Sequence, residues 1–538
     1  WANGLNDLER SRDTIDALIV SGFCDKIITD NGTITDDKEK CKMFRDYYYI
    51  NNKKSFGVDG ISNYIIRKFP HIAFEFLTII FNNCINNGYF PSSWKQARII
   101  PIKKKHGSER LDDFRPISLV SNLGKILEHV IKQKLEAEFI IDPLSCYQFG
   151  FRQSHSTVHA LLKFHNDVTA NLRDKRCTVA ISLDIQKAFD TASHKGILYK
   201  LVELGIDPFL LKLFKSYFLE RSFCIQINNS VSDSGLVNSG VPQGSVLAPF
   251  LFNLFLYDFP HQSTDSRAIL YADDCLIFSH DKSPARALDK ASNHLRIIND
   301  FYKVWGIHVN ASKSEAICIR NASGKCPRFV VPESKRLHLS LDGNEIPFKS
   351  SFKYLGVTFD KLHKFNNHAR IILTKARKIS GMFTRLLNSR FLPNNTKLLI
   401  YKVAIRSVLI YAFPIWFTIS PTVAREMEVF ERHILRKCIN KNFSSYNKRY
   451  SNSTIYNDSL VVPLCSYALA LQRKFIGNLN SHENVLLNQI FENEINFDWS
   501  SSSYLSPVGI MNAVLGVPDE SYSLPDFFTR SVPGTHRG

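Results

Sequence analysis

Three aspartates stand where hydrophobic runs of the sequence end, and together they could support metal-dependent chemistry. Asp273 and Asp274 lie in a Tyr-Ala-Asp-Asp turn between two apolar runs, and Asp184 ends the β-branched run 178–183. Buried charges are avoided unless they are paired or bind a metal. Magnesium prefers carboxylate oxygens, usually one or two per ion, and leaves phosphate and water to complete its shell. Because two such ions stabilise the attacking and leaving oxygens at a phosphorus atom, the three aspartates predict a phosphoryl-transfer site.

Two basic side chains are candidates for holding a triphosphate near such a site. Residues 97–105 read as a strand that includes Lys103, and a polar turn then leads to Arg115, which predicts a hairpin with basic residues on both arms. The guanidinium fork of an arginine fits phosphate oxygens. For either residue the alternative is an ordinary surface charge.

The elements that must position these residues alternate between strands and helices without a strict βαβ rhythm, which favours the α+β class. The Tyr-Ala-Asp-Asp turn predicts a hairpin tip whose two strands lie in the core. The strand predicted at 178–183 precedes a helix with Ser193 as its N-cap and Gly205 as its stop. Residues 223–227 and 234–238 predict a further strand pair.

Composition and charge narrow the class of protein. The 538 residues carry a net charge of +18 and a pI near 9.3, which predicts a polyanionic partner such as a nucleic acid. The eleven cysteines are scattered singly, which argues against a zinc ribbon, a knuckle or a disulfide framework and suits a reducing compartment. The longest uncharged stretch, 234–257, is interrupted by glycines and prolines, so we expect no membrane span.

A basic window at 361–378 is the most cationic helical pattern of the chain. It holds six Lys and Arg residues and no acid, alongside apolar positions such as Ile371 and Ile372. This pattern predicts a helix with one apolar and one basic face. We interpret the basic face as a nucleic-acid contact, and the alternative is a face that is merely solvated.

The chain resembles the reverse transcriptases of non-LTR (LINE-type) retrotransposons, in particular the jockey and I-element group. The resemblance rests on short blocks that occur in the family's order from about Ser55 to Asp360. These blocks begin with Gly57-Val58-Asp59-Gly60, Trp94-Lys95 through Pro101-Ile102-Lys103, Phe114-Arg115-Pro116-Ile117-Ser118-Leu119, and Gln148-Phe149-Gly150-Phe151-Arg152 with His155-Ser156-Thr157. They continue with Leu183-Asp184-Ile185-Gln186-Lys187-Ala188-Phe189-Asp190, Gly240-Val241-Pro242-Gln243-Gly244-Ser245, Tyr271-Ala272-Asp273-Asp274, Asn310-Ala311-Ser312-Lys313-Ser314-Glu315 and Tyr354-Leu355-Gly356-Val357. Single blocks occur by chance, but this many in fixed order do not.

The resemblance implies a right-hand polymerase fold of fingers, palm and helical thumb, with the aspartates on an antiparallel palm sheet. It divides the chain into an N-terminal extension at 1–54, fingers and the start of the palm at 55–178, and the palm at 179–360. The reverse transcriptase domain as a whole covers about 85–360. The thumb follows at 361–460. The C-terminal extension at 461–538 has no assigned role. Residues 1–54 read as helices and loops, with a turn at Asp30 to Gly32.

The resemblance also assigns roles to single residues. Asp184 and Asp273 are implied to be the principal metal ligands, and Asp274 completes the catalytic trio. Phe189 matches the aromatic gate under the incoming sugar, where a ring leaves no room for a 2′-hydroxyl group. Gln243 and Gly244 match the loop beside the incoming base and the template.

The resemblance also implies roles for four basic residues. Lys103 and Arg115 would hold the triphosphate, and Lys313 lies where the family has a lysine near the departing pyrophosphate. Arg152 is implied to meet the template backbone. The basic window at 361–378 would be the thumb helix that follows the product duplex.

The implied activity is RNA-directed DNA synthesis with two Mg²⁺ ions, or Mn²⁺ in their place. The implied partners are an RNA template, a DNA primer or target, and dNTPs, with no membrane and no protein partner named. We expect the protein in the nucleus and in a cytoplasmic ribonucleoprotein, although the sequence shows no targeting signal.

Three alternatives stay open. A decayed element copy would bind nucleic acid without catalysis, a group II intron-type enzyme would carry a C-terminal Cys/His endonuclease, and a telomerase-type enzyme would need a long RNA-binding region before the fingers. The chain starts at Trp1 and shows neither an apurinic-type endonuclease nor a ribonuclease H pattern, so we expect it to be a piece of a longer protein.

Overall fold

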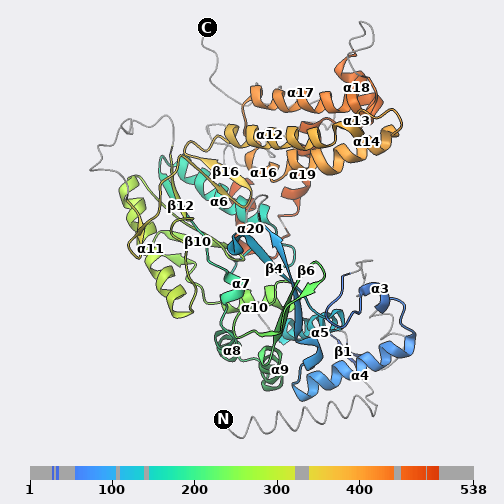
Figure 1. The fold of residues 1–538 in the computed structure, drawn as a ribbon. Helices are drawn as coiled ribbons and strands as arrows, with labels where there is room; N and C mark the ends of the chain where they lie inside the picture. Colours follow the sequence, from blue (N-terminus) through green and yellow to red (C-terminus); the bar gives the residue numbers. More distant parts are fainter. Residues whose placement is uncertain are drawn as a thin grey trace. The chain divides into compact units, whose positions relative to one another are not determined.

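The computed structural model describes residues 27–29, 32–34, 55–104, 110–138, 144–320, 338–441, 450–479 and 481–495 (Figure 1). The chain forms two compact units built from interleaved segments. Unit 1 takes residues up to Ser145, Ile185–Phe259 and Asn299–Val309, and unit 2 takes Cys146–Asp184, Pro260–Ile298 and residues from Asn310 onwards. The domain boundaries proposed from the sequence stay predictions.

Unit 1 contains a mixed sheet whose strands are largely half-buried or exposed. Its strand order is β4-β3-β6-β7, and β8 pairs with β6. The β3–β4 pair is the antiparallel hairpin predicted from the sequence, and β3 pairs with β6 in parallel. The pairing of β6 with β8 confirms the strand pair expected at 223–227 and 234–238. The strands are β3 (Gln96–Lys103), β4 (Phe114–Leu119), β6 (Ser222–Ile227), β7 (Ser230–Val231) and β8 (Gly235–Leu236).

The helices of unit 1 pack mainly on one another, and the starts of two of them follow local chemistry. The Ser193 hydroxyl accepts a hydrogen bond from the Gly196 amide and begins α8, as the sequence predicts, and the Asp207 carboxylate caps α9. The described helices of unit 1 are α3 (Asn63–Ile66), α4 (His71–Asn87), α5 (Asn122–Glu138), α7 (Ala188–Thr191), α8 (His194–Glu203), α9 (Pro208–Phe218) and α10 (Leu247–Phe255), with short 3₁₀ turns at Ser92–Trp94 and Leu111–Asp113.

The described residues of the N-terminal extension form strands where helices and loops were expected. Two short strands, β1 (Ile27–Thr29) and β2 (Gly32–Ile34), pair in antiparallel fashion. Isoleucine and threonine on both sides of an Asn-Gly pair favour a hairpin, and this signal corrects the expectation.

An antiparallel sheet with the order β12-β5-β11-β10-β9 forms the centre of unit 2. Strand β5, which lies between β12 and β11, is buried along nearly its whole length, which explains the largely apolar run at residues 177–183. The strands are β5 (Cys177–Leu183), β9 (Gln262–Ser263), β10 (Ser266–Tyr271), β11 (Asp274–Asp281) and β12 (Glu315–Ile319), with the separate hairpins β13–β14 (Ser340–Leu341, Asn344–Glu345) and β15–β16 (Ser351–Tyr354, Val357–Asp360).

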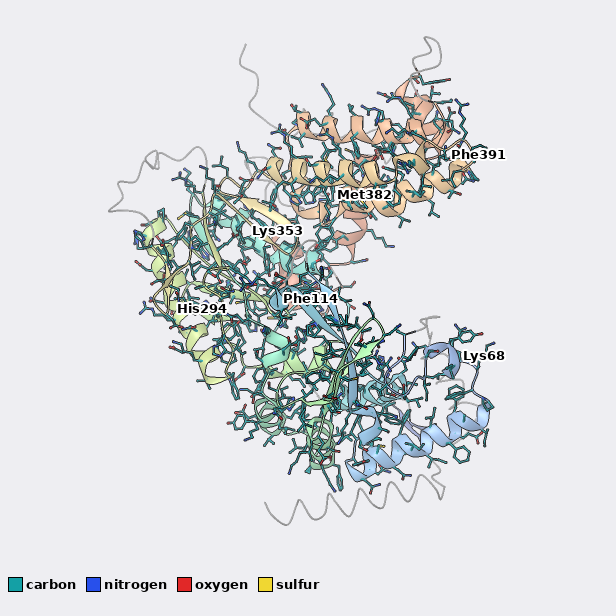
Figure 2. All side chains as sticks on the ribbon, viewed as in Figure 1. Lys68, Phe114, His294, Lys353, Met382 and Phe391 are labelled. Atoms are coloured by element: carbon teal, nitrogen blue, oxygen red, sulfur yellow. The ribbon has the colours of Figure 1, made fainter. Side chains whose placement is uncertain are left out.

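Helix α6 (Thr157–Arg173) precedes β5 in the sequence and packs on β5 and β10. Helix α11 (Pro284–Val304) lies between β11 and β12 in the sequence. The last residues of α11 belong to unit 1. Figure 2 shows the side chains of both units, including His294 on α11.

The C-terminal helices of unit 2 share one hydrophobic core with the sheet. This core runs from Phe149 and Leu276 to Leu487 and Ile490, so part of the predicted extension after residue 460 is integral to the unit. The helices are α12 (Asn366–Met382), α13 (Thr384–Leu387), α14 (Asn394–Ile400), a π-helical turn (Tyr401–Arg406), α15 (Ser407–Ile410), α16 (Phe413–Trp416), α17 (Pro421–Cys438), α18 (Asn452–Ser459), α19 (Leu464–Gly477) and α20 (Val485–Ile495).

A buried carboxylate joins four of these helical elements: α17, the π-helical turn, α18 and α19. Glu431 on α17 accepts hydrogen bonds from the hydroxyls of Tyr401 and Tyr456 and from the Leu464 amide. Burial raises the pKa of Glu431. None of the helices within the described ranges is both long and apolar enough to cross a membrane.

Candidate functional site

The strand register of unit 2 brings the predicted carboxylates to one end of the sheet. Strand β11 pairs with β5 so that Cys275 lies opposite Leu183. Asp274 precedes Cys275 and Asp184 follows Leu183, so these two aspartates occupy the next position of the same antiparallel register. Asp273 lies in the turn between β10 and β11. The three aspartates therefore come together although Asp184 lies far from the other two in the sequence.

The turn that carries Asp273 has an unusual backbone. Ala272 has a φ of 56°, in the left-handed region that costs a non-glycine residue roughly 1–2 kcal/mol. The side-chain Oε1 of Gln148 accepts hydrogen bonds from the Ala272 amide at 3.0 Å and from the Gly150 amide at 2.9 Å. A Cβ on Gly150 would stand 2.1 Å from the Ala272 nitrogen. The Gln-Phe-Gly block is thus a support for the acidic turn, a role that its sequence alone did not reveal.

The loop around Lys313 supports the other carboxylate. The Asn310 amide donates to the carbonyl of Asp184 at 2.7 Å, and the Asp184 amide donates to the Ser314 hydroxyl at 3.2 Å. Lys313 itself is exposed in this loop. The Asn-Ala-Ser-Lys-Ser block therefore fixes the backbone of Asp184 as well as carrying a basic side chain.

The electrostatics of the acidic end of the sheet favour a bound cation. Partial desolvation raises the pKa of Asp274 to about 6, and the charges of Asp273 and Asp184 act in the same direction. The side chains of Asp274 and Asp184 are nevertheless exposed, so a cation can reach them from solvent. A cation placed among these carboxylates would offset their mutual repulsion. Oxygen-only donors of this kind suit Mg²⁺ or Mn²⁺.

A complete metal cage is not formed by protein atoms alone. Across the described ranges no group of three or more His, Cys, Asp or Glu side chains is arranged to hold a metal ion. Magnesium usually takes only one or two carboxylates, with phosphates and water as its other ligands. The aspartate pair of the β5–β11 register fits that donor set.

Within unit 1 the structure brings Phe189 and the Gln243–Gly244 loop together. The Val241 amide donates to the Phe189 carbonyl at 2.7 Å, and the Gln243 side-chain amide donates to the Asp190 carboxylate at 3.0 Å. The Phe189 ring is stacked on Phe252, with the ring centroids 4.6 Å apart. The two sequence blocks therefore form one local structure.

Gly244 is required by close packing and by its backbone. It has a φ of +142°, and a Cβ built on it would stand 2.3 Å from the carbonyl oxygen of Ser118. The Ser118 amide donates to the Gln243 carbonyl at 2.9 Å. Strand β4 is thus directly bonded to the Gln243–Gly244 loop.

Glu128 on α5 also holds this loop, and sequence reasoning missed it. It is only 1% exposed and accepts hydrogen bonds from the Ser245 hydroxyl at 2.8 Å and from the Val246 amide at 2.6 Å. The Tyr217 hydroxyl adds a third at 3.3 Å. Glu128 is one of three glutamates in this amphipathic helix, and the sequence gave no signal that distinguished it from the solvated ones.

Lys103 and Arg115 lie on neighbouring strands of the β3–β4 hairpin, and both are exposed. Lys103 pairs with Phe114, and its ammonium nitrogen lies 5.9 Å from the centre of that ring, which is labelled in Figure 2. Arg115 pairs with Ile102. Because successive residues of a strand face opposite sides, Lys103 and Arg115 lie on opposite faces of the hairpin.

Arg152 has a structural contact in addition to its predicted template role. Its guanidinium donates to the Gln148 carbonyl at 3.3 Å. It therefore belongs to the same loop that supports Ala272.

The basic window predicted as a helix forms most of α12, which begins at Asn366, later than expected. Its basic side chains Arg370, Lys375, Arg377 and Lys378 are exposed, whereas Ala369, Ile372, Leu373 and Ala376 are buried. The amphipathic pattern is confirmed.

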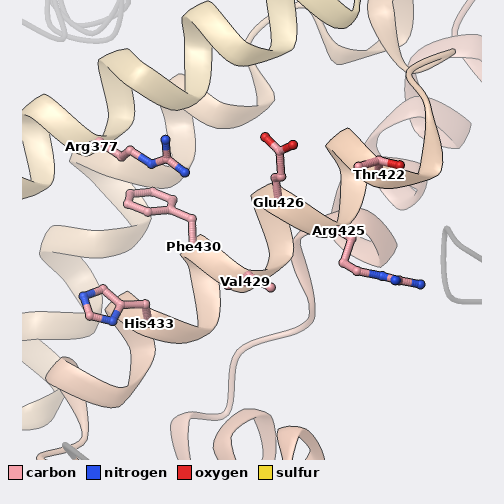
Figure 3. Close-up of a pocket in the computed structure, with 7 residues that line it drawn as sticks. All are labelled: Arg377, Thr422, Arg425, Glu426, Val429, Phe430 and His433. Atoms are coloured by element: carbon pink, nitrogen blue, oxygen red, sulfur yellow. The ribbon is translucent and has the colours of Figure 1, made fainter.

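A groove of about 490 Å³ lies between α12 and α17. Arg377 comes from α12, and the other lining residues, Thr422, Arg425, Glu426, Val429, Phe430 and His433, come from α17 (Figure 3). The two arginines lie next to the apolar side chains of Val429 and Phe430, a combination that suits a polyanion with apolar surface.

The comparisons with known proteins agree with these features. Residues 102–359 match the family described as "Reverse transcriptase (RNA-dependent DNA polymerase)". The chain is 30% identical over 449 residues to the RNA-directed DNA polymerase from mobile element jockey of Drosophila melanogaster, with 81% of this chain and 47% of that protein covered. It is 29% identical over 398 residues to the probable RNA-directed DNA polymerase from transposon BS of the same organism, with 71% and 42% covered.

The chain thus spans about half the length of the curated relatives that it matches. A solved telomerase of Candida tropicalis with a telomeric RNA fragment is 12% identical, covering 79% of this chain and 68% of that one, with a TM-score of 0.35. The family match and the mixture of helices and antiparallel sheet confirm the predicted α+β class and right-hand polymerase fold. Residues 102–359 of this chain form a reverse transcriptase domain, and over 81% of its length the chain is similar to the polymerase of the non-LTR mobile element jockey.

Proposed function

We propose that the protein is an RNA-directed DNA polymerase of a non-LTR retrotransposon, which extends a DNA primer on an RNA template with dNTPs. The observation that carries this proposal is the register of β5 and β11, which places Asp184 and Asp274 side by side next to Asp273. The raised pKa of Asp274 supports it, because a cluster of carboxylates that repel one another is a site for cations. Enzymes of this family use divalent metal ions.

In the proposed reaction the primer 3′-oxygen attacks the α-phosphorus of the dNTP, and pyrophosphate leaves. Two Mg²⁺ ions, when bound, neutralise the charge that develops on the attacking and leaving oxygens. Asp184, Asp273 and Asp274 would hold the ions, and the Gln148 contact keeps the turn of Asp273 in place. Lys103, Arg115 and Lys313 are proposed to neutralise the triphosphate, and Arg152 to contact the template.

Sugar selection is proposed for Phe189. Its ring is fixed by the stack on Phe252 and by the backbone bond to Val241, so it cannot easily move away from a 2′-hydroxyl. The Gln243–Gly244 loop, bonded to β4 on one side and to α5 on the other, is proposed to lie beside the incoming base.

The test is Mg²⁺-dependent extension of a DNA primer on an RNA template, with dNTPs and rNTPs in parallel. We expect the wild-type protein to extend the primer with dNTPs only. Asp273→Asn should lose extension but bind the template as before, and Phe189→Ala should also incorporate rNTPs. Equal extension by wild type and Asp273→Asn would contradict the proposal. Salt-sensitive template binding without any extension would identify a folded relic instead.

We also propose that the protein enters the nucleus, because a polymerase of this kind copies RNA into chromosomal DNA. Imaging of a tagged protein tests this. Exclusion from nuclei in cells where the element transposes would contradict it.

A further inference from the structure

The loop at residues 146–155 is joined to the catalytic turn on one side. The Leu270 amide donates to the Tyr147 carbonyl and the Phe149 amide donates to the Leu270 carbonyl, both at 2.9 Å. Beyond these bonds, the Gln148 side chain holds the Ala272 amide, as described above. Any movement of this loop is therefore transmitted to the backbone next to Asp273.

The other side of the loop is joined to the corner at residues 482–484, between α19 and α20. The Asn484 side-chain amide donates to the Cys146 carbonyl at 2.8 Å and lies 3.1 Å from Nε2 of His155. The Nε2 of His482 lies 3.0 Å from the Ser154 carbonyl. Asn484 is 4% exposed and His482 9%, so water does not readily replace these bonds.

The loop needs partners of this kind because its backbone is strained. Phe151 and Ser154 have φ values of 55° and 59°, in the left-handed region that costs a non-glycine residue roughly 1–2 kcal/mol. Such conformations persist only when the surrounding structure enforces them. The corner bonds the two ends of the loop, at Cys146 and at Ser154–His155.

The hydrogen-bond pattern assigns the protons of both histidines. Nδ1 of His155 lies 2.7 Å from the Gln153 carbonyl and donates to it, so Nε2 accepts from Asn484. Nδ1 of His482 accepts a hydrogen bond from the backbone amide of Asn484 at 3.0 Å. Nε2 therefore carries the hydrogen that is donated to the Ser154 carbonyl. Both imidazoles are neutral in this arrangement.

The charged and titratable groups around His155 also favour the neutral ring. Burial is the main cause that lowers the pKa of His155, and Arg152 and His482 lower it further. The hydrogen bond to the Gln153 carbonyl and the charge of Glu483 act in the opposite direction. The ring of His159 on α6 meets the His482 ring edge-on at 4.7 Å. Burial lowers the pKa of His159 to about 4, so it adds no charge near neutral pH.

We propose that the corner at 482–484, and Asn484 above all, positions the catalytic turn through the loop at 146–155. Asn484 touches no reacting atom and acts through Gln148 and Gly150, which support Ala272. This inference rests on the proposed polymerase function, and it gives the segment after residue 460 a role in catalysis that the sequence did not suggest.

The first test compares Asn484→Ala with Asn478→Ala, an exposed asparagine of the same segment at the end of α19. We expect Asn484→Ala to lower kcat by about tenfold or more, because displacement of a catalytic group by about 1 Å costs up to ~100-fold. The KM for dNTP and the affinity for primer–template should stay within about twofold, because the substrate contacts are not altered. Asn478→Ala should behave as wild type, and equal kcat in all three proteins would overturn the proposal.

The second test uses Asn484→Asp, which keeps the shape but replaces the donor by a carboxylate. While Nδ1 of His155 keeps its bond to the Gln153 carbonyl, Nε2 can donate to a carboxylate only when the ring is protonated. The new carboxylate itself raises the pKa of His155, so the variant regains this contact as the pH falls. We expect its activity relative to wild type at the same pH to rise several-fold between pH 8.5 and pH 6.5. A ratio that stays flat or falls would contradict the hydrogen-bond assignment.

A third measurement separates this inference from the proposed function. Amide hydrogen exchange of the protein without substrates reports on Gly150 and Ala272, whose amides bond to Gln148. We expect Asn484→Ala to speed their exchange by about tenfold or more and to leave α17 unchanged. If wild type does not extend primers, the polymerase proposal fails, and unchanged exchange at these two amides would overturn the coupling independently.

Discussion

At the scale of single residues, the site depends on backbone approaches that only glycine permits. Gly150 packs against the Ala272 nitrogen and Gly244 against the Ser118 carbonyl. The first approach supports the turn of Asp273, and the second fixes the loop beside Phe189. Substitution at these positions tests the geometry without altering any charged group.

We predict that Gly150→Ala lowers kcat by roughly 100-fold, because its Cβ would need the place of the Ala272 backbone. Steady-state primer extension measures this effect. Gly381→Ala is the matched control, because no atom lies within 4 Å of the added Cβ and the site is inside α12. That change should keep activity and stabilise the fold by roughly 0.5–1 kcal/mol. Full activity of Gly150→Ala would show that the turn does not need this support.

Glu128→Gln should loosen the Gln243–Gly244 loop. A glutamine cannot accept the bonds from Ser245, Val246 and Tyr217 together, and the loss of a buried bond costs about 1–3 kcal/mol. We expect a several-fold higher KM for dNTP and a lower melting temperature. Glu136→Gln on the same helix is the control, because Glu136 is exposed and pairs only with Lys132 among the described residues. Unchanged KM in Glu128→Gln would remove the loop from the nucleotide site.

At the scale of elements, the sequence predicted what depends on local pattern. The apolar runs around Asp273 and before Asp184 identified β10, β11 and β5, and the basic window identified α12. Contacts between distant segments gave no such pattern. Gln148, Glu128 and Asn484 are ordinary polar residues in the sequence, and their importance comes from partners that lie far away along the chain.

The exposed face of α12 is expected to bind nucleic-acid phosphates. Lys378→Gln and Arg377→Gln should each weaken template–primer binding and reduce the slope of log Kd against log salt concentration by about one. Fluorescence anisotropy across a salt series measures both quantities. Lys474→Gln on α19 is the control with the same loss of charge at an exposed position. Equal effects of all three substitutions would mean that only net charge matters.

At the scale of the whole molecule, unit 2 buries many uncharged histidines. His165 and His363 are stacked with a 2.8 Å contact between ring nitrogens, and burial lowers the pKa of His363 to about 3. Burial likewise lowers the pKa of His261 and of His368 to about 4. The unfolded chain binds protons at these rings below pH 6.5, whereas the folded chain does not.

We therefore predict that stability is complete above about pH 6.5 and falls as the pH drops from 6.5 towards 4. Each of these histidines contributes on the order of 1–2 kcal/mol to the loss at pH 5. Thermal melts at several pH values test this, and His363→Gln or His368→Gln should make the dependence on pH shallower. His338→Gln, at an exposed position, should not. A dependence that is unchanged in all variants would assign the acid sensitivity to other groups.

The bond between Asn484 and the loop at 146–155 also has a consequence for synthesis on the ribosome. All three aspartates proposed to hold metal ions are translated before residue 275, but Asn484 emerges about 200 residues later. At ~5–20 residues per second the growing chain waits roughly 10–40 s between these events. During that interval it carries the three aspartates without the corner proposed to align them. Premature termination before residue 482 would therefore release a protein that still presents its basic surfaces to RNA and copies it poorly.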